Sequence, residues 1–328
     1  MTVGSKMPGS AGESHSGAIF GRMSALPGTL PPFRTTRFAP SPTGYLHLGH
    51  VANAVWTWGV AQASGARVLL RLEDHDRSRC RPEYEKAIYE DLDWLGFEVV
   101  PESRESLEGG SSSYRQSNNN PLYRAALEPL RATARVYGCR CSRSTITRAL
   151  REAGFEEWDE LRYPGTCRDL GVPLDDGVGV RVVLADEPVE FEDLLLGAQQ
   201  QSPAEQSGDL LLRDATGNWT YQFCVTVDDL RHDVDLVVRG EDLLASTGRQ
   251  IMLASLLGRA TPARFLHHPL IRNAEGVKLS KRDGAVGVRE LRALGRKPVE
   301  VLGEAAWRTG LLPENRSVRP SELGGLFR

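Results

Sequence analysis

The 328-residue chain is poor in cysteine, in long apolar runs and in net positive charge, and each shortage excludes a class of protein. Its five cysteines are an odd number in a chain much longer than a small disulfide-stapled secreted domain, so we expect a reducing, cytoplasmic environment. No apolar run approaches the roughly 18 residues that a membrane-spanning helix needs, and we expect no membrane contact. The net charge of −3 excludes indiscriminate nucleic-acid binding, which needs a positive field over the whole molecule.

One local patch of positive charge is nevertheless present. Seven arginines lie between residues 124 and 151, against a single acid, Glu128. The segment is either a solvated helix face or a contact surface for RNA, and the pattern by itself favours neither interpretation.

The first 36 residues differ in composition from the rest of the chain. They are rich in Gly, Ser, Ala and Pro and lack the continuous apolar stretch of a signal peptide. We therefore expect a disordered leader over residues 1–36. The chain as a whole is 40% hydrophobic and 25% charged, a profile typical of a soluble globular protein with one large or two medium domains.

The periodicity of the next hundred residues predicts alternating strands and helices. A short strand at 36–39 precedes a helix at 51–65 that is apolar almost all round and should be buried. A β-rich run at 66–74 and an amphipathic helix at 81–97 follow. Strand, helix, strand and helix at this spacing predict a βαβ unit and an α/β fold with a doubly wound parallel sheet.

The middle of the chain is less regular. We expect a surface loop rich in Ser, Asn and Gly at 102–120, a helix at 122–138 and a second polar loop at 197–208. The segment 209–223 has the pattern of a hairpin that turns at Gly217. Buried-strand and helical patterns then return, so one nucleotide-binding domain is interrupted by an insertion at roughly 101–208.

The stretch RFAPSPTGYLHLGH at 37–50 places two histidines between a strand and a buried helix. Backbone N–H groups and the positive end of the helix dipole at such a junction form a ready site for phosphate. The ring N–H groups of His47 and His50 could donate to phosphate oxygens there. A single histidine would more simply be a packed or surface residue, but a pair around a glycine favours the phosphate site.

A second basic signal lies far downstream, where VKLSKR occupies residues 277–282 after an Asn-Ala-Glu-Gly turn. A basic loop beside a nucleotide fold can close over a polyphosphate and neutralise the charge that develops during transfer. Taken alone, this run is an ordinary solvated basic segment.

Together, HLGH and KLSKR on a βαβ framework resemble the HIGH and KMSKS motifs of class I aminoacyl-tRNA synthetases. The runs RFAPSPTG, RLEDHDRSR, TYQFCVTVDD and VVRGEDLLAST are similar to the glutamyl branch. The chain lacks the Pro-Pro-Glu-Pro-Asn form of the first motif that is typical of the glutaminyl branch. The resemblance covers residues 37–285 in order, and it implies a Rossmann-type catalytic core with an inserted α+β zinc-binding subdomain and a short helical C-terminal remnant.

The resemblance also implies a role for each matching residue. Arginine suits a carboxylate because it grips both oxygens by paired hydrogen bonds. Glu73 would pair with the α-ammonium group of glutamate. The implied glutamate-binding residues are Arg37, Ala39, Ser41, Glu73, Tyr221 and Arg239. The implied ATP-binding residues are His47, Gly49, His50, Lys278 and Lys281.

The implied reaction is adenylation. The glutamate carboxylate attacks the α-phosphate of ATP in line and pyrophosphate leaves, with Mg²⁺ assisting. The protein contributes positioning and charge stabilisation, and the glutamyl group then passes to a hydroxyl on RNA. Arg282 and Leu279 stand where the family has Ser and Met, but neither change removes a lysine.

Three cysteines gather inside the expected insertion. Cys139 and Cys141 form a C-x-C pair, and Cys167 follows within 29 residues. Three thiolates in a cytoplasmic chain suggest Zn²⁺, for which a structural site has four ligands, whereas three unligated cysteines are the alternative. Glutamyl-type enzymes that keep this site join the C-x-C pair to a Y-x3-C pair, so the resemblance implies that Tyr163 is the fourth ligand.

Only 46 residues follow Arg282, with patterns for two helices at 288–312. Full glutamyl-tRNA synthetases carry a large helical anticodon-binding region there. The short chain therefore resembles the glutamyl-queuosine tRNA(Asp) synthetase family, monomers that activate L-glutamate without tRNA and glutamylate the queuosine base in the anticodon of tRNA(Asp). The alternatives are a truncated glutamyl-tRNA synthetase that charges a tRNA 3′ end, and a non-catalytic relative that binds RNA or senses an amino acid.

The resemblance divides the chain into five expected parts. These are a disordered leader (1–36), the first half of the catalytic domain (37–100), an inserted acceptor-type zinc subdomain (101–208), the second half with the KLSKR loop (209–285) and a short helical C-terminal segment without an anticodon-binding domain (286–328).

Overall fold

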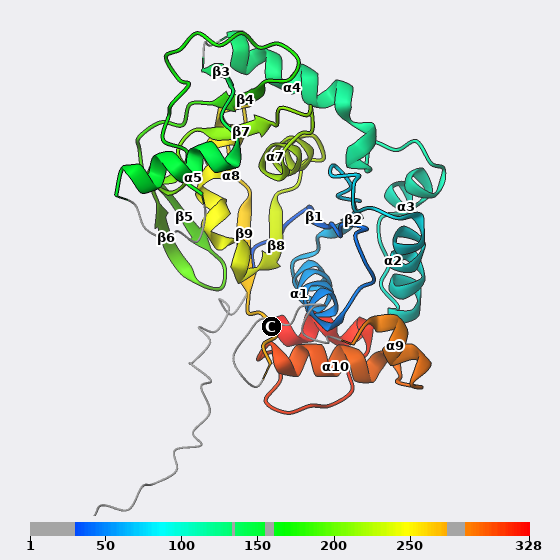
Figure 1. Cartoon of the computed structure of the whole chain (residues 1–328). Helices are drawn as coiled ribbons and strands as arrows, with labels where there is room; N and C mark the ends of the chain where they lie inside the picture. The colour runs from blue at the N-terminus through cyan, green and yellow to red at the C-terminus, as the bar shows by residue number, and fades with distance from the viewer. Residues whose placement is uncertain (1–29, 133–134, 155–160, 274–285) are drawn as a thin grey trace, which may run out of the picture.

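The computed structural model describes residues 30–132, 135–154, 161–273 and 286–328 (Figure 1). Lys278 and Lys281 lie outside the described residues. The described strands form three sheets: a parallel pair β1-β2, an antiparallel sheet β3-β4-β7, and a four-stranded sheet in the order β6-β5-β9-β8.

The first βαβ unit is confirmed. Strands β1 (Thr35–Phe38) and β2 (Arg67–Leu70) pair in parallel, and α1 (Leu48–Ser64) connects them. Because α1 is apolar on almost every side, it is buried between the parallel strands and the C-terminal helices. The helix ends at Gly65, whose φ of 80° is a left-handed conformation that glycine adopts without strain.

The disordered leader expected at residues 1–36 extends too far into the chain. Leu30 and Phe33 are buried in one hydrophobic cluster with Trp56 of α1 and Leu236. Residues 30–36 therefore belong to the folded part of the chain, since their apolar side chains remove surface of α1 from water. Residues 1–29 lie outside the described part.

Helix α2 (Pro82–Leu95) is confirmed with its expected boundaries, a proline in the first turn and Gly96 at its end. The expected loop at 102–120 is wrong, because α3 (Pro101–Glu108) and the 3₁₀ turn η1 (Gln116–Asn118) occupy it. Leu107 of α3 is buried in the same cluster as α1 and α2. Tertiary packing thus stabilises a helix that its polar sequence does not favour.

The insertion holds the antiparallel sheet. Strands β3 (Val136–Cys139), β4 (Gly179–Val182) and β7 (Leu210–Arg213) pair in that order, between the helices α4 (Asn120–Ala132) and α5 (Arg143–Glu152). The helix expected at 122–138 therefore ends six residues early. Val136 and Tyr137 prefer the pleated surface of a sheet, and they pair with β4.

Two more expectations in this region are wrong. The polar loop expected at 197–208 contains β6 (Gly197–Gln201) and the short helix α6 (Pro203–Ser207). β6 pairs along its whole length with β5 (Val189–Asp193), so backbone hydrogen bonds to a neighbouring strand stabilise it without an apolar pattern. The hairpin expected at 209–223 is reduced to one bridge, because α7 begins at Tyr221.

The second half of the catalytic region supplies two parallel strands and their helices. Strands β8 (Leu236–Gly240) and β9 (Arg264–His268) run in parallel. The buried-strand pattern of the sequence predicts β8. The connecting elements are α7 (Tyr221–Arg231) before β8, and the 3₁₀ turn η2 (Glu241–Ser246) with α8 (Thr247–Leu256) between β8 and β9. β8 lies beside β1, where the backbone N–H of Asp235 donates to Thr35 O.

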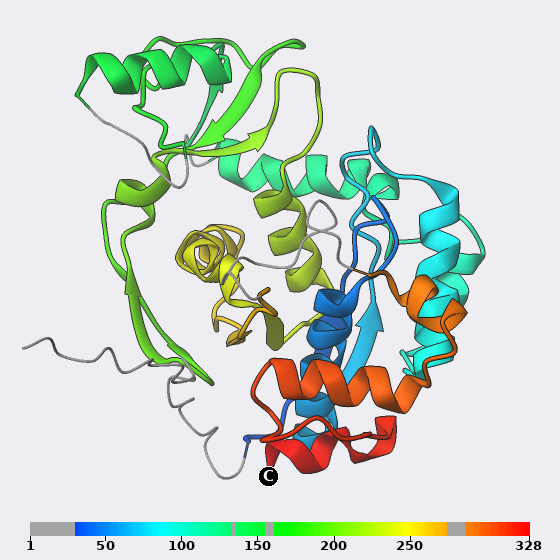
Figure 2. The same ribbon diagram turned by 60° about the horizontal axis from the view of Figure 1, so that its bottom comes forward.

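The two C-terminal helices are confirmed as α9 (Val288–Ala293) and α10 (Pro298–Arg308). They are followed by a 3₁₀ helix, η4 (Pro320–Phe327), where the sequence suggests only a polar tail. Figure 2 shows α10 and η4 packed against α1, and the Phe327 ring lies 5.2 Å from that of Trp56. Gly59 permits this contact, because a Cβ there would lie 2.1 Å from the Phe327 ring.

The elements therefore form a central body with an attachment at each end. In Figure 1 the β3-β4-β7 sheet and α5 lie at one end, α9 and α10 at the other, and α1, β1 and β8 between them. None of the described helices is long and apolar enough to cross a membrane.

Candidate active site and candidate metal centre

The two histidines of HLGH cap the first turn of α1. His47 has extended backbone angles, and its Nδ1 accepts from the Gly49 N–H at 3.1 Å. The Nδ1 of His50 accepts from the His47 N–H, also at 3.1 Å. Because each Nδ1 accepts a hydrogen, the proton of each neutral ring lies on Nε2. Gly49 is needed here, since a Cβ would lie 2.9 Å from the His47 ring.

A cavity of about 260 Å³ lies beside this turn, at the carboxyl ends of β1 and β8. Parallel α/β sheets bind ligands at this edge of the strands. Its lining includes eight residues that the sequence assigns to glutamate or ATP: Arg37, Ala39, His47, Gly49, His50, Glu73, Tyr221 and Arg239.

Ser41 is the expected glutamate ligand that the structure does not bring to the cavity. It is exposed and is not among the lining residues. Its backbone oxygen accepts from the Thr43 N–H at 2.8 Å, in a tight turn that places Ser41 at the surface.

A chain of buried opposite charges holds two residues that line the cavity, Arg37 and Glu73. The Arg37 Nε atom lies 3.2 Å from a carboxylate oxygen of Asp229, and Arg71 donates to the same oxygen at 2.5 Å. Arg71 also donates to Glu73 at 2.9 Å. Burial would raise the pKa of Asp229, but Arg37 and Arg71 lower it to about 2. Arg37 and Glu73 thus reach the cavity already held in place.

Arg239 occupies a different environment. Its guanidinium donates to His267 Nε2 at 3.0 Å, to Gln250 Oε1 at 2.7 Å and to Thr247 Oγ1 at 2.8 Å. All three acceptors are neutral groups, and the ion pairs of the described residues include none for Arg239. Burial, more than any charged neighbour, lowers the pKa of Arg239. A buried cation whose direct partners are neutral is well suited to an anionic ligand.

Sequence reasoning missed the residues that hold the cavity residues in place. Arg71 and Asp229 stand in runs that the sequence singles out, RLEDHDRSR and TYQFCVTVDD, and a charged residue in an otherwise buried pattern was the available signal. His267 and Asp193 carry no such signal, because His267 contacts Arg239 across 28 positions of sequence and Asp193 contacts His267 across 74.

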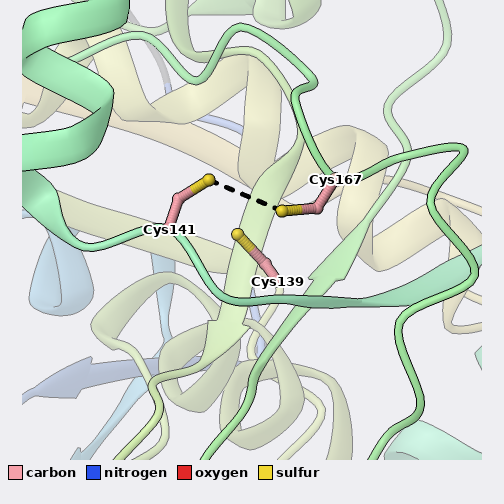
Figure 3. Close-up of side chains that lie close together, drawn as sticks. All are labelled: Cys139, Cys141 and Cys167. Atoms are coloured by element: carbon pink, nitrogen blue, oxygen red, sulfur yellow. Dashed lines mark hydrogen bonds between the residues drawn. The ribbon is translucent and has the colours of Figure 1, made fainter.

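The three cysteines of the insertion come together in one cluster (Figure 3). The sulfur atoms of Cys139, Cys141 and Cys167 lie within 4.8 Å of one another, and those of Cys141 and Cys167 are 3.5 Å apart. Thiolates bound tetrahedrally to Zn²⁺ at about 2.3 Å would lie about 3.8 Å apart, so this spacing fits a metal. All five cysteines are free thiols, and the triad could hold a metal ion.

Tyr163 lies at the same cluster. Its hydroxyl is 3.4 Å from the Cys139 sulfur, 4.0 Å from the Cys141 sulfur and accepts from the Cys167 backbone N–H at 2.8 Å. The guanidinium of Arg181 lies 3.6 Å from the centre of its ring. The tyrosine oxygen therefore lies beside the sulfur atoms of Cys139 and Cys141.

The arginines between residues 124 and 151 do not share one helix. They are exposed and distributed over α4, the neighbourhood of β3, and α5. Arg131 pairs with Glu128 at 3.3 Å, and Arg148 lies 3.9 Å from Glu152. The interpretation as a single solvated helix face is therefore wrong, and the question of RNA contact is not decided by this arrangement.

Comparison with known proteins agrees with the geometry. A family model for the catalytic domain of class I tRNA synthetases (E and Q) matches residues 34–317. A glutamyl-Q tRNA(Asp) synthetase of Symbiobacterium thermophilum is 40% identical over 299 residues, 89% of this chain and 91% of that protein. A glutamate–tRNA ligase of Geobacter sulfurreducens is 36% identical, over 84% of this chain and 57% of the ligase.

Solved structures show the same likeness. The crystal structure of a glutamate tRNA ligase from Elizabethkingia meningosepticum, in complex with its amino acid, superposes with a TM-score of 0.73 at 27% identity. The match covers 90% of this chain and 64% of that one. The chain thus spans nearly all of the Symbiobacterium protein and less than two thirds of either ligase.

Proposed function

The chain belongs to the class I glutamyl- and glutaminyl-tRNA synthetase family, in the branch of the glutamyl-Q tRNA(Asp) synthetases, and we propose that it activates L-glutamate with ATP and transfers it to the queuosine base of tRNA(Asp). One observation carries this proposal. Arg239 is buried, its hydrogen-bond partners are neutral, and it lines the same cavity as the histidines that cap the start of α1. One cavity there offers a cation for a carboxylate and helix-end donors for a phosphate.

We assign the glutamate site to the inner part of the cavity. Arg37 and Arg239 would bind the substrate carboxylates, and Glu73 would bind the α-ammonium group. Tyr221 and Ala39 complete the lining. The cations Arg37 and Arg239 and the anion Glu73 are opposite in charge to the two carboxylates and the ammonium group of glutamate. Asp229 keeps Arg37 in position for this contact.

We assign the nucleotide to the start of α1. The Nε2–H groups of His47 and His50 and the helix N-terminus would stabilise the phosphates of ATP, with Gly49 allowing close approach. From the sequence, Lys278 and Lys281 would add charge on the phosphates. When bound, Mg²⁺ would neutralise part of the triphosphate charge.

The proposed reaction follows from the assigned positions of glutamate and ATP in the cavity. A glutamate carboxylate oxygen attacks the α-phosphorus, the bond to the β-phosphate oxygen breaks, and pyrophosphate leaves with both electrons of that bond. The chain contributes orientation and positive charge at the phosphates. In the second step a hydroxyl of the acceptor attacks the activated carboxyl carbon and releases AMP.

The queuosine acceptor is supported by relatives of matching length. Five proteins named glutamyl-Q tRNA(Asp) synthetase are 37 to 40% identical over 81 to 92% of this chain. The glutamate–tRNA ligase of Geobacter sulfurreducens matches only 57% of its own length, which makes a 3′-end charging enzyme the second candidate.

Glutamate-dependent exchange of pyrophosphate into ATP tests the activation step. We expect exchange with glutamate and ATP alone, without tRNA, and transfer of labelled glutamate to tRNA(Asp) that contains queuosine. The matched control is the same tRNA(Asp) with guanosine at that position, which should accept no glutamate. Absence of exchange under any condition would refute the proposal that this chain is a glutamate-activating enzyme. Exchange only with tRNA(Glu), and charging of its 3′ end, would favour the second candidate.

We also propose that the cluster of Cys139, Cys141, Cys167 and Tyr163 holds a structural Zn²⁺. The sulfur spacing and the position of the tyrosine oxygen support four ligands. A bound ion would join β3 to the segment that carries Tyr163 and Cys167.

Replacing Cys141 with serine should release this metal and loosen the insertion. We expect elemental analysis to show less than about a tenth of the wild-type zinc, and the unfolding midpoint to fall by about 5 °C or more, because metal binding and folding are coupled. Cys80→Ser, outside the cluster, is the control and should retain the metal. Equal zinc in both variants would rule out the proposed site.

Other features follow from the same assignment. We propose that β1-β2 and β8-β9 are the two parallel halves of one doubly wound sheet, since β1 and β8 lie side by side. The halves would comprise residues 30–100 and 209–285, with the zinc subdomain inserted at 101–208 and the short helical segment at 286–328. We expect a cytoplasmic monomer.

A further inference from the structure

Asp193, at the end of β5, is a buried carboxylate with both oxygens occupied. One oxygen accepts from the backbone N–H groups of Leu195 at 3.0 Å and Leu196 at 2.9 Å. The other accepts from the backbone N–H of His267 at 3.1 Å and from its ring Nδ1 at 2.6 Å. Neither Asp193 nor His267 is among the residues that line the cavity.

The partners of His267 determine which ring nitrogen carries the proton. An ionised carboxylate only accepts hydrogen bonds, so Nδ1 must donate to Asp193. A guanidinium only donates, so Nε2 must accept from Arg239. Burial lowers the pKa of His267, in agreement with a neutral ring. Asp193 thus makes His267 an acceptor on the side that faces Arg239.

Arg239 is held on three sides by this arrangement. Together with His267, Gln250 and Thr247 accept from its three nitrogen atoms, and the side chain is 4% exposed. A planar guanidinium with all three nitrogens bonded cannot turn to suit a different ligand. A substrate carboxylate presents only acceptors to it, whereas the NH₂ group of a glutamine amide would bring a donor against donors.

We propose that Asp193 and His267 are positioning residues that hold Arg239 as a fixed carboxylate receptor, and that they thereby set the preference for glutamate over glutamine. The proposal rests on the proposed function, because it deepens the role of Arg239 in the glutamate site. The negative charge nearest to this hydrogen-bond chain belongs to Asp193, which does not contact Arg239. The neutral imidazole of His267 lies between them. Arg239 therefore keeps its charge for the ligand and does not form an ion pair within the protein.

Asp193→Asn tests the inference, because asparagine is isosteric and its oxygen can still accept from Leu195 and Leu196. Its NH₂ group would donate to His267 Nδ1, which transfers the ring proton to Nε2 and turns a donor toward Arg239. The same NH₂ group cannot accept from the His267 backbone N–H, so a loss of stability is also expected. We expect the KM for glutamate in pyrophosphate exchange to rise about tenfold or more. The KM for ATP should stay within about twofold, and the ratio of kcat/KM for glutamate to that for glutamine should fall about tenfold.

Asp209→Asn is the matched control. Asp209 is a buried carboxylate that pairs with Arg168 and Tyr137 in the insertion, away from the cavity. It should lose stability without a change in the glutamate-to-glutamine ratio. His267→Gln is the second variant if Asp193→Asn does not fold, and it should change the two KM values and the ratio in the same directions.

The outcomes separate this inference from the proposed function. No glutamate-dependent exchange by the wild-type chain would overturn both. Normal wild-type exchange with an unchanged glutamate KM and an unchanged ratio in the folded variant would overturn the positioning role alone. Parallel changes in the glutamate and ATP KM values would also overturn it, because a loss of general structure affects both substrates.

Discussion

Replacing Arg239 with leucine is expected to reduce kcat/KM for glutamate in pyrophosphate exchange by about a thousandfold or more. The side chain is 4% exposed, and its direct partners are three neutral acceptors, so its charge is available to the substrate. Leucine would leave a substrate carboxylate buried without a cation, and it would also leave Gln250 Oε1 without its donor, while Thr247 and His267 keep the hydrogen bond of 3.1 Å to each other. The KM for ATP should change little, because the nucleotide is assigned to the start of α1.

Two further variants make this result specific. Arg239→Lys keeps the charge but loses the fixed planar donors, so it should recover only a small part of the activity. Arg259→Leu is the matched control, because Arg259 donates to backbone oxygens near the opposite end of β8 and lies outside the cavity. A normal glutamate KM in Arg239→Leu would show that the carboxylate binds elsewhere.

Replacing Asp229 with asparagine is expected to destabilise the protein by about 3 to 5 kcal/mol at neutral pH, the range for breaking a buried ion pair from one side. Asp229 is 7% exposed and bonds both Arg37 and Arg71. Without its charge, Arg37 would lose its ion pair, and Arg71 would keep its ion pair with Glu73. Urea unfolding at pH 7 measures the loss, and the glutamate KM should rise as Arg37 loses its support.

The pH dependence of the wild type tests the same residue. The pKa of Asp229 is lowered to about 2 in the folded chain, below its ordinary value of 3.8. A lowered carboxyl pKa contributes stability that is fully present above about pH 4 and is lost as the pH falls toward 2. The stability of Asp229→Asn should therefore fall less steeply than that of the wild type between about pH 4 and about pH 2.

The control for both measurements is Asp186→Asn, an exposed carboxylate. It should leave the stability at pH 7 within about 0.5 kcal/mol of the wild type, and it should leave the acid slope unchanged. If Asp229→Asn behaves like this control, the buried charge chain does not stabilise the fold.

Sequence alone was sufficient for features that depend on near neighbours. The boundaries of α1 and α2 follow from apolar periodicity and from glycines that end each helix. The HLGH turn and the C-x-C pair could be read because their residues are a few positions apart, whereas Tyr163 was implied only by the family resemblance.

The wrong expectations share a physical cause. Helix α3 at 101–108 and strand β6 at 197–201 are polar segments that neighbouring elements stabilise, through buried Leu107 in one case and a full ladder with β5 in the other. Composition described these segments correctly as polar, but it carries no information on what packs against them.

The sequence by itself determined the first βαβ unit, the family resemblance and eight of the residues that line the cavity. Only the tertiary structure showed that Ser41 lies outside the cavity, that Asp229 pairs with Arg37 across 192 positions, and that Asp193 and His267 hold Arg239. A buried charge can be recognised in the sequence, because a charged residue stands in an otherwise apolar pattern. Its partner depends on how β5, β8, β9 and α7 pack together, and no local sequence pattern predicts that packing.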